Sequence, residues 1–169
     1  EIIYFIDGEW QIVFIDDSFP YDPRKKDFAF ATPNNKELWA MLLEKSWAKI
    51  NGGYSNIVGG IISDPISALT GFPTEYLHHN QFDNEEVYKR LEEGNKTGTI
   101  MSSASKKGSS IEKQGLIQSH AYTLIDVKKL EKRNIYLLKL RNPWGEREWK
   151  GKWSDQSPCW TEEYKRYFG

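Results

Sequence analysis

Two mainly apolar runs separated by a polar turn open the sequence, a pattern typical of a β-hairpin. Two strand-like runs, 2–6 and 10–15, flank Asp7-Gly8, a dipeptide that favours a tight hairpin turn. A further short apolar run at 28–31 predicts another strand.

A helix is predicted next, with Asn34 as its N-cap and Glu37 three residues on, as in a capping box. Asn51-Gly52-Gly53 is expected to stop it. Five apolar residues recur at helical spacing and predict its core face: Trp39, Leu42, Leu43, Trp47 and Ile50.

A second helix is predicted over 84–93, with Asp83 as its cap and Gly94 as its stop. A short strand at 99–102 follows. Residues 103–115 are rich in Ser, Lys and Gly, which predicts a mobile loop. This loop leads towards His120, so it could act as a gate or be a plain surface excursion.

Two strands dominate the second half, at 120–127 and 134–142, with a polar turn between them. Folding them antiparallel about Glu131 pairs residues whose numbers sum to 262. His120 then faces Asn142, and directly opposed residues project from the same face of a sheet. The predicted hairpin therefore brings an imidazole and a carboxamide together.

That pairing suggests a chemical role. An Asn oxygen can accept the proton of one ring nitrogen of a His and leave the other facing a nucleophile, as in the Cys-His-Asn arrangement of papain-like proteases. Pro143 disfavours helical backbone at Asn142 and should keep it extended. The alternative is a buried His that bonds to an Asn for structural reasons alone.

Composition narrows the class of protein. The chain has 169 residues, 38% hydrophobic and 14% aromatic, as expected of a packed globular protein with one domain or two small lobes. We expect an α+β fold with an antiparallel sheet dominating its second half. The net charge of −1 gives no overall field for nucleic acid or anionic membrane, so neither is an expected partner.

Further sequence features concern compartment and completeness. The single cysteine, Cys159, cannot form an intrachain disulfide, which suits a reducing, cytoplasmic compartment. No apolar run has the length of a membrane span. Because the sequence lacks an initiator Met and opens in a strand pattern, we interpret it as a fragment of a longer protein.

Several sequence motifs resemble those of one protein family. The runs 115–122 (GLIQSHAY), 140–149 (LRNPWGEREW) and 153–155 (WSD) resemble the second protease-core subdomain of calpains. The segments 13–20 (VFIDDSFP) and 38–53 (LWAMLLEKSWAKINGG) fit the same family, as do Gly59-Gly60 and residues 69–71. The resemblance covers nearly the whole chain, and the Arg-Asn-Pro-Trp-Gly run is its most specific part.

The resemblance implies a fold and an activity. It implies a papain-like right-hand subdomain, an antiparallel, barrel-like lobe with flanking helices, as a catalytic-domain fragment over 1–169. Calpains are intracellular, calcium-dependent cysteine endopeptidases that make limited cuts in protein substrates. By resemblance, His120 is the general base, Asn142 orients it, Trp144 borders the cleft and Gly60 contacts the substrate backbone. Ser119 stands where the family usually has Gly.

The resemblance also implies calcium. Glu148 and Asp155 match two ligands of the family, whose remaining ligands lie in a later acidic stretch. Calcium takes six to eight oxygen ligands, so these two carboxylates would form only part of a site.

The nucleophile of such a protease lies in an upstream Cys-bearing subdomain, within a Gln…Gly-x-Cys-Trp segment that this sequence lacks. Cys159 follows His120, lacks the helix N-terminus expected to activate a thiol, and is interpreted as a free structural thiol. The chain alone is therefore predicted not to hydrolyse peptides.

Three alternatives remain open. The chain could be a catalytically dead calpain-like module that serves interaction or regulation. Its seven tryptophans could form a carbohydrate- or peptide-binding surface. A zinc site from His78, His79 and His120 is conceivable, but adjacent histidines in an extended segment point opposite ways.

Overall fold

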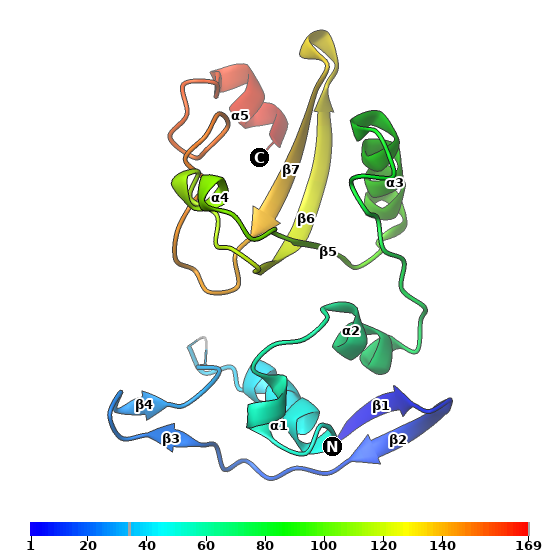
Figure 1. Ribbon diagram of the computed structural model, residues 1–169, viewed down its shortest axis with the longest axis vertical. Coiled ribbons are helices and arrows are strands. Elements are labelled where there is room, and N and C mark those ends of the chain that lie inside the picture. Colours follow the sequence, from blue (N-terminus) through cyan, green and yellow to red (C-terminus); the bar gives the residue numbers. More distant parts are fainter. Residues whose placement is uncertain (34, 169) are drawn as a thin grey trace. The chain divides into compact units, whose positions relative to one another are not determined.

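The computed structural model describes residues 1–33 and 35–168. The chain divides into two compact units, Glu1–Tyr76 and the part from Leu77 onward. Each unit combines helices with small antiparallel sheets (Figure 1). The predicted α+β fold class is therefore confirmed.

The first unit contains two short antiparallel pairs and three helical segments. Its elements are β1 (Ile2–Ile6), β2 (Glu9–Val13), β3 (Tyr21–Asp22), β4 (Asp27–Phe28), α1 (Trp39–Ile50), the 3-10 helix η1 (Tyr54–Ile57) and α2 (Ser63–Thr70).

The second unit is built on a three-stranded sheet with the order β5-β6-β7. Its elements are α3 (Asn84–Thr97), β5 (Met101–Ala104), α4 (Ser109–Lys113), β6 (Ala121–Leu130), the 3-10 helix η2 (Glu131–Arg133), β7 (Ile135–Arg141) and α5 (Glu162–Phe168).

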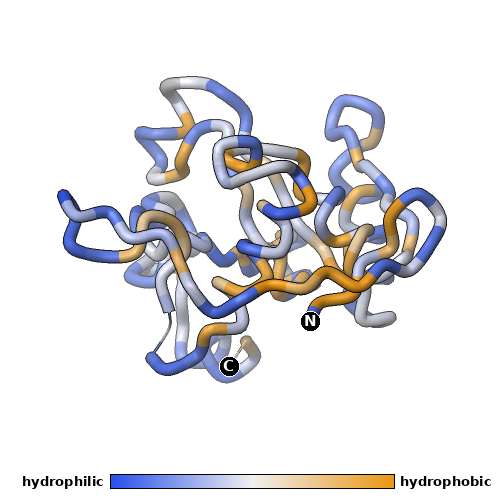
Figure 2. Tube along the Cα trace, turned by 90° about the horizontal axis from the view of Figure 1, so that it is seen from below, coloured by the Kyte–Doolittle hydropathy of each residue, from blue (hydrophilic) through white to orange (hydrophobic). Residues whose placement is uncertain are grey.

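The β1–β2 hairpin forms as its sequence predicts. Asp7 and Gly8 both have positive φ, 53° and 85°, as a two-residue hairpin turn of this kind requires. Ile6 pairs with Glu9 directly beside that turn. The strand β1 is apolar along most of its length, visible as the orange start of the tube at the N-terminus in Figure 2.

Helix α1 begins later than predicted, and its most exposed predicted core residue is Trp39, whereas Leu42, Leu43, Trp47 and Ile50 are half-buried. The predicted N-cap Asn34 lies outside the described residues, and Leu38 holds the N-cap position without a side-chain cap bond. Trp39 is 62% exposed, so its predicted place in the core is wrong. The buried residues are Met41, Ser46 and Ala48.

The strand β1 packs against α1 through Tyr4. Tyr4 is buried, and its hydroxyl lies 2.7 Å from the Ser46 Oγ. Burial raises the pKa of the Tyr4 phenol, and the hydrogen bond with Ser46 offsets part of that rise. A small polar residue on the helix therefore contacts the strand where the apolar pattern alone predicted large side chains.

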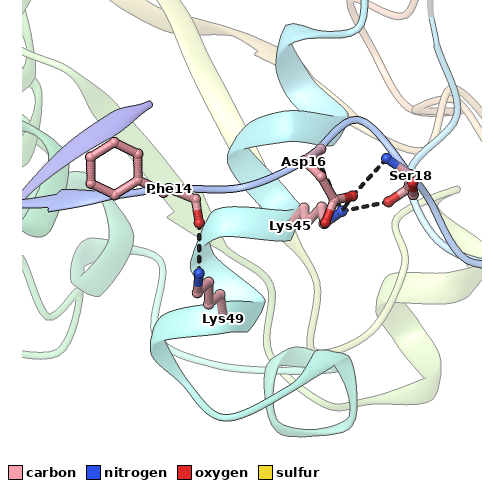
Figure 3. Close-up of polar contacts among 5 residues, drawn as sticks. All are labelled: Phe14, Asp16, Ser18, Lys45 and Lys49. Carbon is pink, nitrogen blue, oxygen red and sulfur yellow. Dashed lines mark hydrogen bonds and ion pairs between the residues drawn. The ribbon is translucent and has the colours of Figure 1, made fainter.

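Two lysines of α1 fix the segment that follows β2 (Figure 3). Lys45 donates to the Asp16 carboxylate, to the Asp16 carbonyl at 3.2 Å and to the Ser18 carbonyl at 2.5 Å. Lys49 donates to the Phe14 carbonyl at 2.7 Å. The Lys45 contact and the Ser18 N–H hold the pKa of Asp16 down at about 2. These contacts satisfy backbone carbonyls that no strand partner reaches.

Helix α3 starts as predicted but runs further. Asp83 caps it by accepting from the Glu86 N–H at 2.8 Å. Gly94 does not stop the helix, which continues to Thr97. The C-cap residue Gly98 then adopts the left-handed conformation. A Cβ on Gly94 would lie 2.9 Å from the Met101 Sδ, so this glycine permits close packing between α3 and β5.

The core of the second unit lies between α3 and the sheet. Its buried members are Tyr88, Leu124 and Val127. Figure 1 shows α3 on one side of the β6–β7 hairpin and α5 on the other. The Tyr88 ring packs 4.7 Å from the ring of Tyr136, centroid to centroid.

The predicted register of the β6–β7 hairpin is wrong. Leu130 pairs with Ile135, because four residues connect the strands and the last of them, Asn134, is left-handed with a φ of 49°. A bulge between Leu124 and Asp126 then shifts the register again. The strand pairing itself therefore does not place His120 opposite Asn142.

The predicted mobile loop over 103–115 contains regular structure. Its first residues belong to β5, and α4 occupies Ser109–Lys113. Helices α2 and α5 were not predicted. Within the described residues, no helix has the length and apolar character needed to cross a lipid bilayer.

Candidate active site

His120 and Asn142 meet although the strand register does not pair them. His120 directly precedes β6 and Asn142 directly follows β7. The His120 Nε2 lies 2.8 Å from the Asn142 Oδ1. His120 is only 8% exposed, so little water competes for this bond. We call the two residues the dyad.

Main-chain groups fix the direction of the Asn142 amide. Its Oδ1 accepts from the Trp144 N–H at 3.1 Å, and its Nδ2 donates to the Glu146 carbonyl. A backbone N–H can only donate and a carbonyl can only accept, so the amide cannot be flipped without losing both bonds.

This orientation decides which nitrogen of the imidazole carries a proton. Because the atom facing the Nε2 is the Asn142 oxygen, the Nε2 must donate. A neutral His120 ring therefore presents its lone pair at the Nδ1. Within the described part of the chain, no group forms a hydrogen bond with that Nδ1. The arrangement provides an imidazole of defined tautomer with one nitrogen available as a base.

Aromatic rings surround the imidazole. The Trp144 ring centroid lies 4.3 Å from that of His120, and the Tyr122 ring lies 5.0 Å away in an edge-on arrangement. Trp144 is 66% exposed, and it projects from a turn in which the Gly145 N–H donates to the Asn142 carbonyl at 3.1 Å. The exposed tryptophan thus covers a buried histidine.

The turn before His120 is held by side-chain hydroxyls. Ser119 has a φ of 47°, in the left-handed region that favours glycine. The Tyr122 hydroxyl accepts from the Ile117 N–H at 2.9 Å. The Ser105 hydroxyl accepts from the His120 N–H at 3.0 Å. Glycine would adopt this left-handed backbone at position 119 with less strain than serine.

A close backbone contact links the loop before His120 to the loop after Asn142. Gly115 has a φ of 90°, and a Cβ there would lie 1.9 Å from the Glu148 carbonyl oxygen. Next to it, the Lys150 N–H donates to the Gln114 carbonyl at 2.9 Å. Only glycine fits at this point of contact.

The residues proposed for calcium do not form a complete site by themselves. Glu148 and Asp155 are both exposed. Among residues 1–33 and 35–168, no group of three or more His, Cys, Asp or Glu side chains is gathered to hold a metal ion. The zinc site considered for His78, His79 and His120 is therefore not formed in that part of the chain.

Gly60 and Cys159 take part in none of the hydrogen bonds described above. Gly60 belongs to the first unit, is exposed, and has open space where a Cβ would lie. Cys159 is a half-buried free thiol in the segment before α5, where its N–H donates to the Ser157 Oγ at 3.2 Å.

Sequence comparisons identify the family of the chain. A family model described as calpain family cysteine protease matches residues 1–168. The chain belongs to the calpain family of cysteine proteases.

Individual relatives give the extent of the likeness. The calpain-type cysteine protease DEK1 of Zea mays is 36% identical over 96% of this chain and 8% of its own length. The calpain-1 catalytic subunit of Rattus norvegicus is 36% identical over 92% of this chain and 22% of its own length. Calpain-14 of Homo sapiens is 37% identical over 90% of this chain and 22% of its own length. The chain thus spans less than a quarter of these relatives.

Sequence reasoning found the two members of the dyad but missed the groups that hold them. One signal was available: Asn followed by Pro and Gly favours a turn in which the Asn oxygen accepts from the N–H two residues on, which is the Trp144 contact. Ser105 carried no such signal, because its role depends on pairing with a distant strand.

Proposed function

We propose that this chain is the His- and Asn-bearing part of a calpain-type cysteine endopeptidase. In this proposal His120 is the general base, Asn142 orients it, and an upstream Cys-bearing subdomain of the same polypeptide supplies the nucleophile. One observation carries the proposal: the bond from the His120 Nε2 to an Asn142 oxygen whose direction the main chain fixes.

The chemistry follows from that tautomer. The His120 Nδ1 accepts the proton of the cysteine thiol, and the thiolate attacks the carbonyl carbon of the scissile peptide bond. The resulting imidazolium returns its proton to the departing amine as the C–N bond breaks, which leaves a thioester. Water then loses a proton to the Nδ1 as it attacks the thioester, and the thiolate leaves and is reprotonated. Asn142 keeps the orientation of the His120 ring fixed throughout by accepting a hydrogen bond from the Nε2.

Other residues receive narrower roles in the proposal. Trp144 borders the substrate cleft, while Gly60 and Ser119 contact the substrate backbone. Glu148 and Asp155 contribute two ligands to a calcium site that other parts of the longer protein complete. The substrates are intracellular proteins, and the 169-residue chain alone is inactive because it lacks the thiolate.

A catalytically dead calpain-like module is the competing proposal. A binding module has no need for an oriented imidazole with an available nitrogen, so the dyad favours the enzyme. The sequence upstream of Glu1 discriminates the two, because only the enzyme requires a cysteine in the Gln…Gly-x-Cys-Trp segment.

The test uses the natural protein that contains this chain and an unstructured peptide or casein-type substrate. His120→Ala should abolish turnover, and Asn142→Ala should lower kcat by about 100-fold. His79→Ala, an exposed histidine in the same unit, is the matched control and should retain full activity. A protein without turnover, or one whose turnover survives His120→Ala, contradicts the proposal.

A further inference from the structure

We infer that Ser105 is a positioning residue for His120: it holds the main chain of His120 so that the imidazole meets Asn142. The inference deepens the proposed function and rests on His120 acting as the general base. The hydrogen bonds between the Ser105 hydroxyl and His120 are to main-chain atoms of His120, so Ser105 would act through the backbone.

The strand pairing shows how Ser105 is placed. Ala104 pairs with Ala121 at the end of the β5–β6 ladder, so Ser105 and His120 form the next pair outward. The Ser105 N–H donates to the His120 carbonyl at 2.9 Å. In a regular antiparallel pair the His120 N–H would return to the Ser105 carbonyl. Here it donates to the Ser105 Oγ at 3.0 Å instead. A side-chain hydroxyl thus replaces a main-chain acceptor at this pair.

The same hydroxyl also holds the turn that precedes His120. Its Oγ donates to the Ile117 carbonyl at 2.5 Å and lies 3.3 Å from the His120 carbonyl. One hydroxyl therefore ties both ends of a four-residue turn. That turn contains Ser119 in the left-handed region, where a residue with a Cβ persists only if its surroundings hold it. Loss of the hydroxyl would free the turn to relax.

Relaxation of this turn would reach the dyad. The Nε2–Oδ1 distance of 2.8 Å is close to the optimum for a hydrogen bond. The Asn142 side is fixed independently by the Trp144 N–H and the Glu146 carbonyl. A shift of the His120 backbone by about 1 Å would stretch the bond, and misplacement of that size can cost two orders of magnitude in rate.

A merely structural role for Ser105 makes a different prediction. It would lower the amount of folded protein without changing the turnover of each folded molecule. The two roles separate when kcat and KM are measured per competent active site, with the sites counted by a stoichiometric peptide-based inactivator that reacts only in the substrate-binding site.

The experiment uses Ser105→Ala, Ser105→Thr and Ser102→Ala in the natural protein that contains this chain. Ser102 is an exposed serine of β5 whose side chain forms no hydrogen bond within the described residues, so it is the matched control. We expect Ser105→Ala to lower kcat per site at least about tenfold with KM within about twofold. Ser105→Thr, which keeps the hydroxyl, should restore most of kcat, and Ser102→Ala should change neither value.

Equal kcat per site in Ser105→Ala and the unaltered protein would overturn the inference. So would a loss confined to KM, or a threonine variant no better than alanine. If Ser105→Ala does not fold, Ser105→Cys replaces it, because a thiol has a similar size but forms weaker hydrogen bonds. A kcat of the cysteine variant between the values of the unaltered protein and Ser105→Thr would overturn the inference. Activity that does not depend on His120 overturns the proposed function itself, which the His120→Ala variant shows separately.

Discussion

The β1–β2 and β6–β7 hairpins differ in how their ends are held. Pairing in β1–β2 is continuous over Ile2–Ile6, and a two-residue turn closes it. In β6–β7 a bulge interrupts the pairing, and His120 and Asn142 stand just outside the ladder. There, hydrogen bonds from neighbouring loops place them. The comparison teaches that strand pairing brings two loops near each other, whereas loop contacts set the final geometry of the dyad.

The largest expected effect on the free energy of unfolding comes from substituting one glycine in each of these two regions. Gly8 in the β1–β2 turn and Gly115 beside the dyad have nearly equal φ, 85° and 90°. A Cβ on Gly8 meets nothing within 4 Å, but a Cβ on Gly115 would lie 1.9 Å from the Glu148 carbonyl oxygen. Gly8→Ala should lower the free energy of unfolding by about 1 kcal/mol through backbone strain alone.

Gly115→Ala should cost about 3 kcal/mol or more, because a backbone clash adds to the same strain. Urea unfolding of the 169-residue chain measures both variants. Equal losses would mean that the contact between Gly115 and Glu148 does not constrain the loops.

The next effect concerns Asp126, which lies at the bulge of β6. Burial acts to raise the pKa of this carboxyl, but hydrogen bonds to the carboxylate outweigh burial and leave its pKa below the ordinary value. The donors are Lys128, the Val127 N–H and Asn95. A lowered folded-state pKa adds stability above the unfolded-state pKa, and that stability is lost as the pH falls through the folded-state pKa.

Asp126→Asn should therefore lower the free energy of unfolding by about 1–2 kcal/mol at pH 7. The deficit should shrink below about pH 4, near the ordinary pKa of an aspartate. Unfolding curves of both proteins across pH 2–7 provide the measurement. Curves that stay parallel down to pH 2 would exclude this role for the carboxylate.

A smaller effect is expected from Tyr122, which braces the turn before His120. Tyr122→Phe keeps the buried ring but removes the acceptor for the Ile117 N–H, so it should cost about 1 kcal/mol. Tyr136→Phe is the control, because its hydroxyl forms no hydrogen bond within the described residues. Thermal unfolding should separate the two variants, and matching midpoints would contradict the bracing role.

The smallest effect should be a gain in stability. Ser119→Gly removes the strain of a left-handed serine but adds chain entropy to the unfolded state, so we expect a net stabilisation of about 0.5 kcal/mol. Ser119→Ala keeps the strain and should bring no gain. A destabilised glycine variant would show that the serine side chain itself supports the turn.

Local sequence signals predicted the elements that local interactions decide. The turn at Asp7-Gly8, the N-cap Asp83 and the end of α1 near Asn51 follow from turn and capping chemistry within a few residues. The prediction of Gly94 as a helix stop was wrong. A glycine at this position makes room for the Met101 side chain of β5, a contact that no local pattern reveals.

The dyad was found by a route that was partly wrong. The sequence predicted that His120 and Asn142 meet, but through a strand register that a bulge and a four-residue connection exclude. The bulge shifts the alternation of buried positions by one residue, so that Tyr122 and Leu124 are buried before it and Val127 after it, and the prediction did not take this shift into account. The contact between Ser46 of α1 and the Tyr4 hydroxyl of β1 was also not predicted, because the two residues lie 42 positions apart in the sequence.

The main-chain partners of Asn142 carry a consequence for sequence variation. A backbone N–H and a carbonyl persist whatever side chain a residue has. Residues 144 and 146 can therefore change type without reversing the Asn142 amide, as long as the turn itself forms. Proline at 144 is the exception, because it has no N–H to donate. The side chains at positions 144 and 146 therefore do not determine which nitrogen of the His120 ring donates to Asn142.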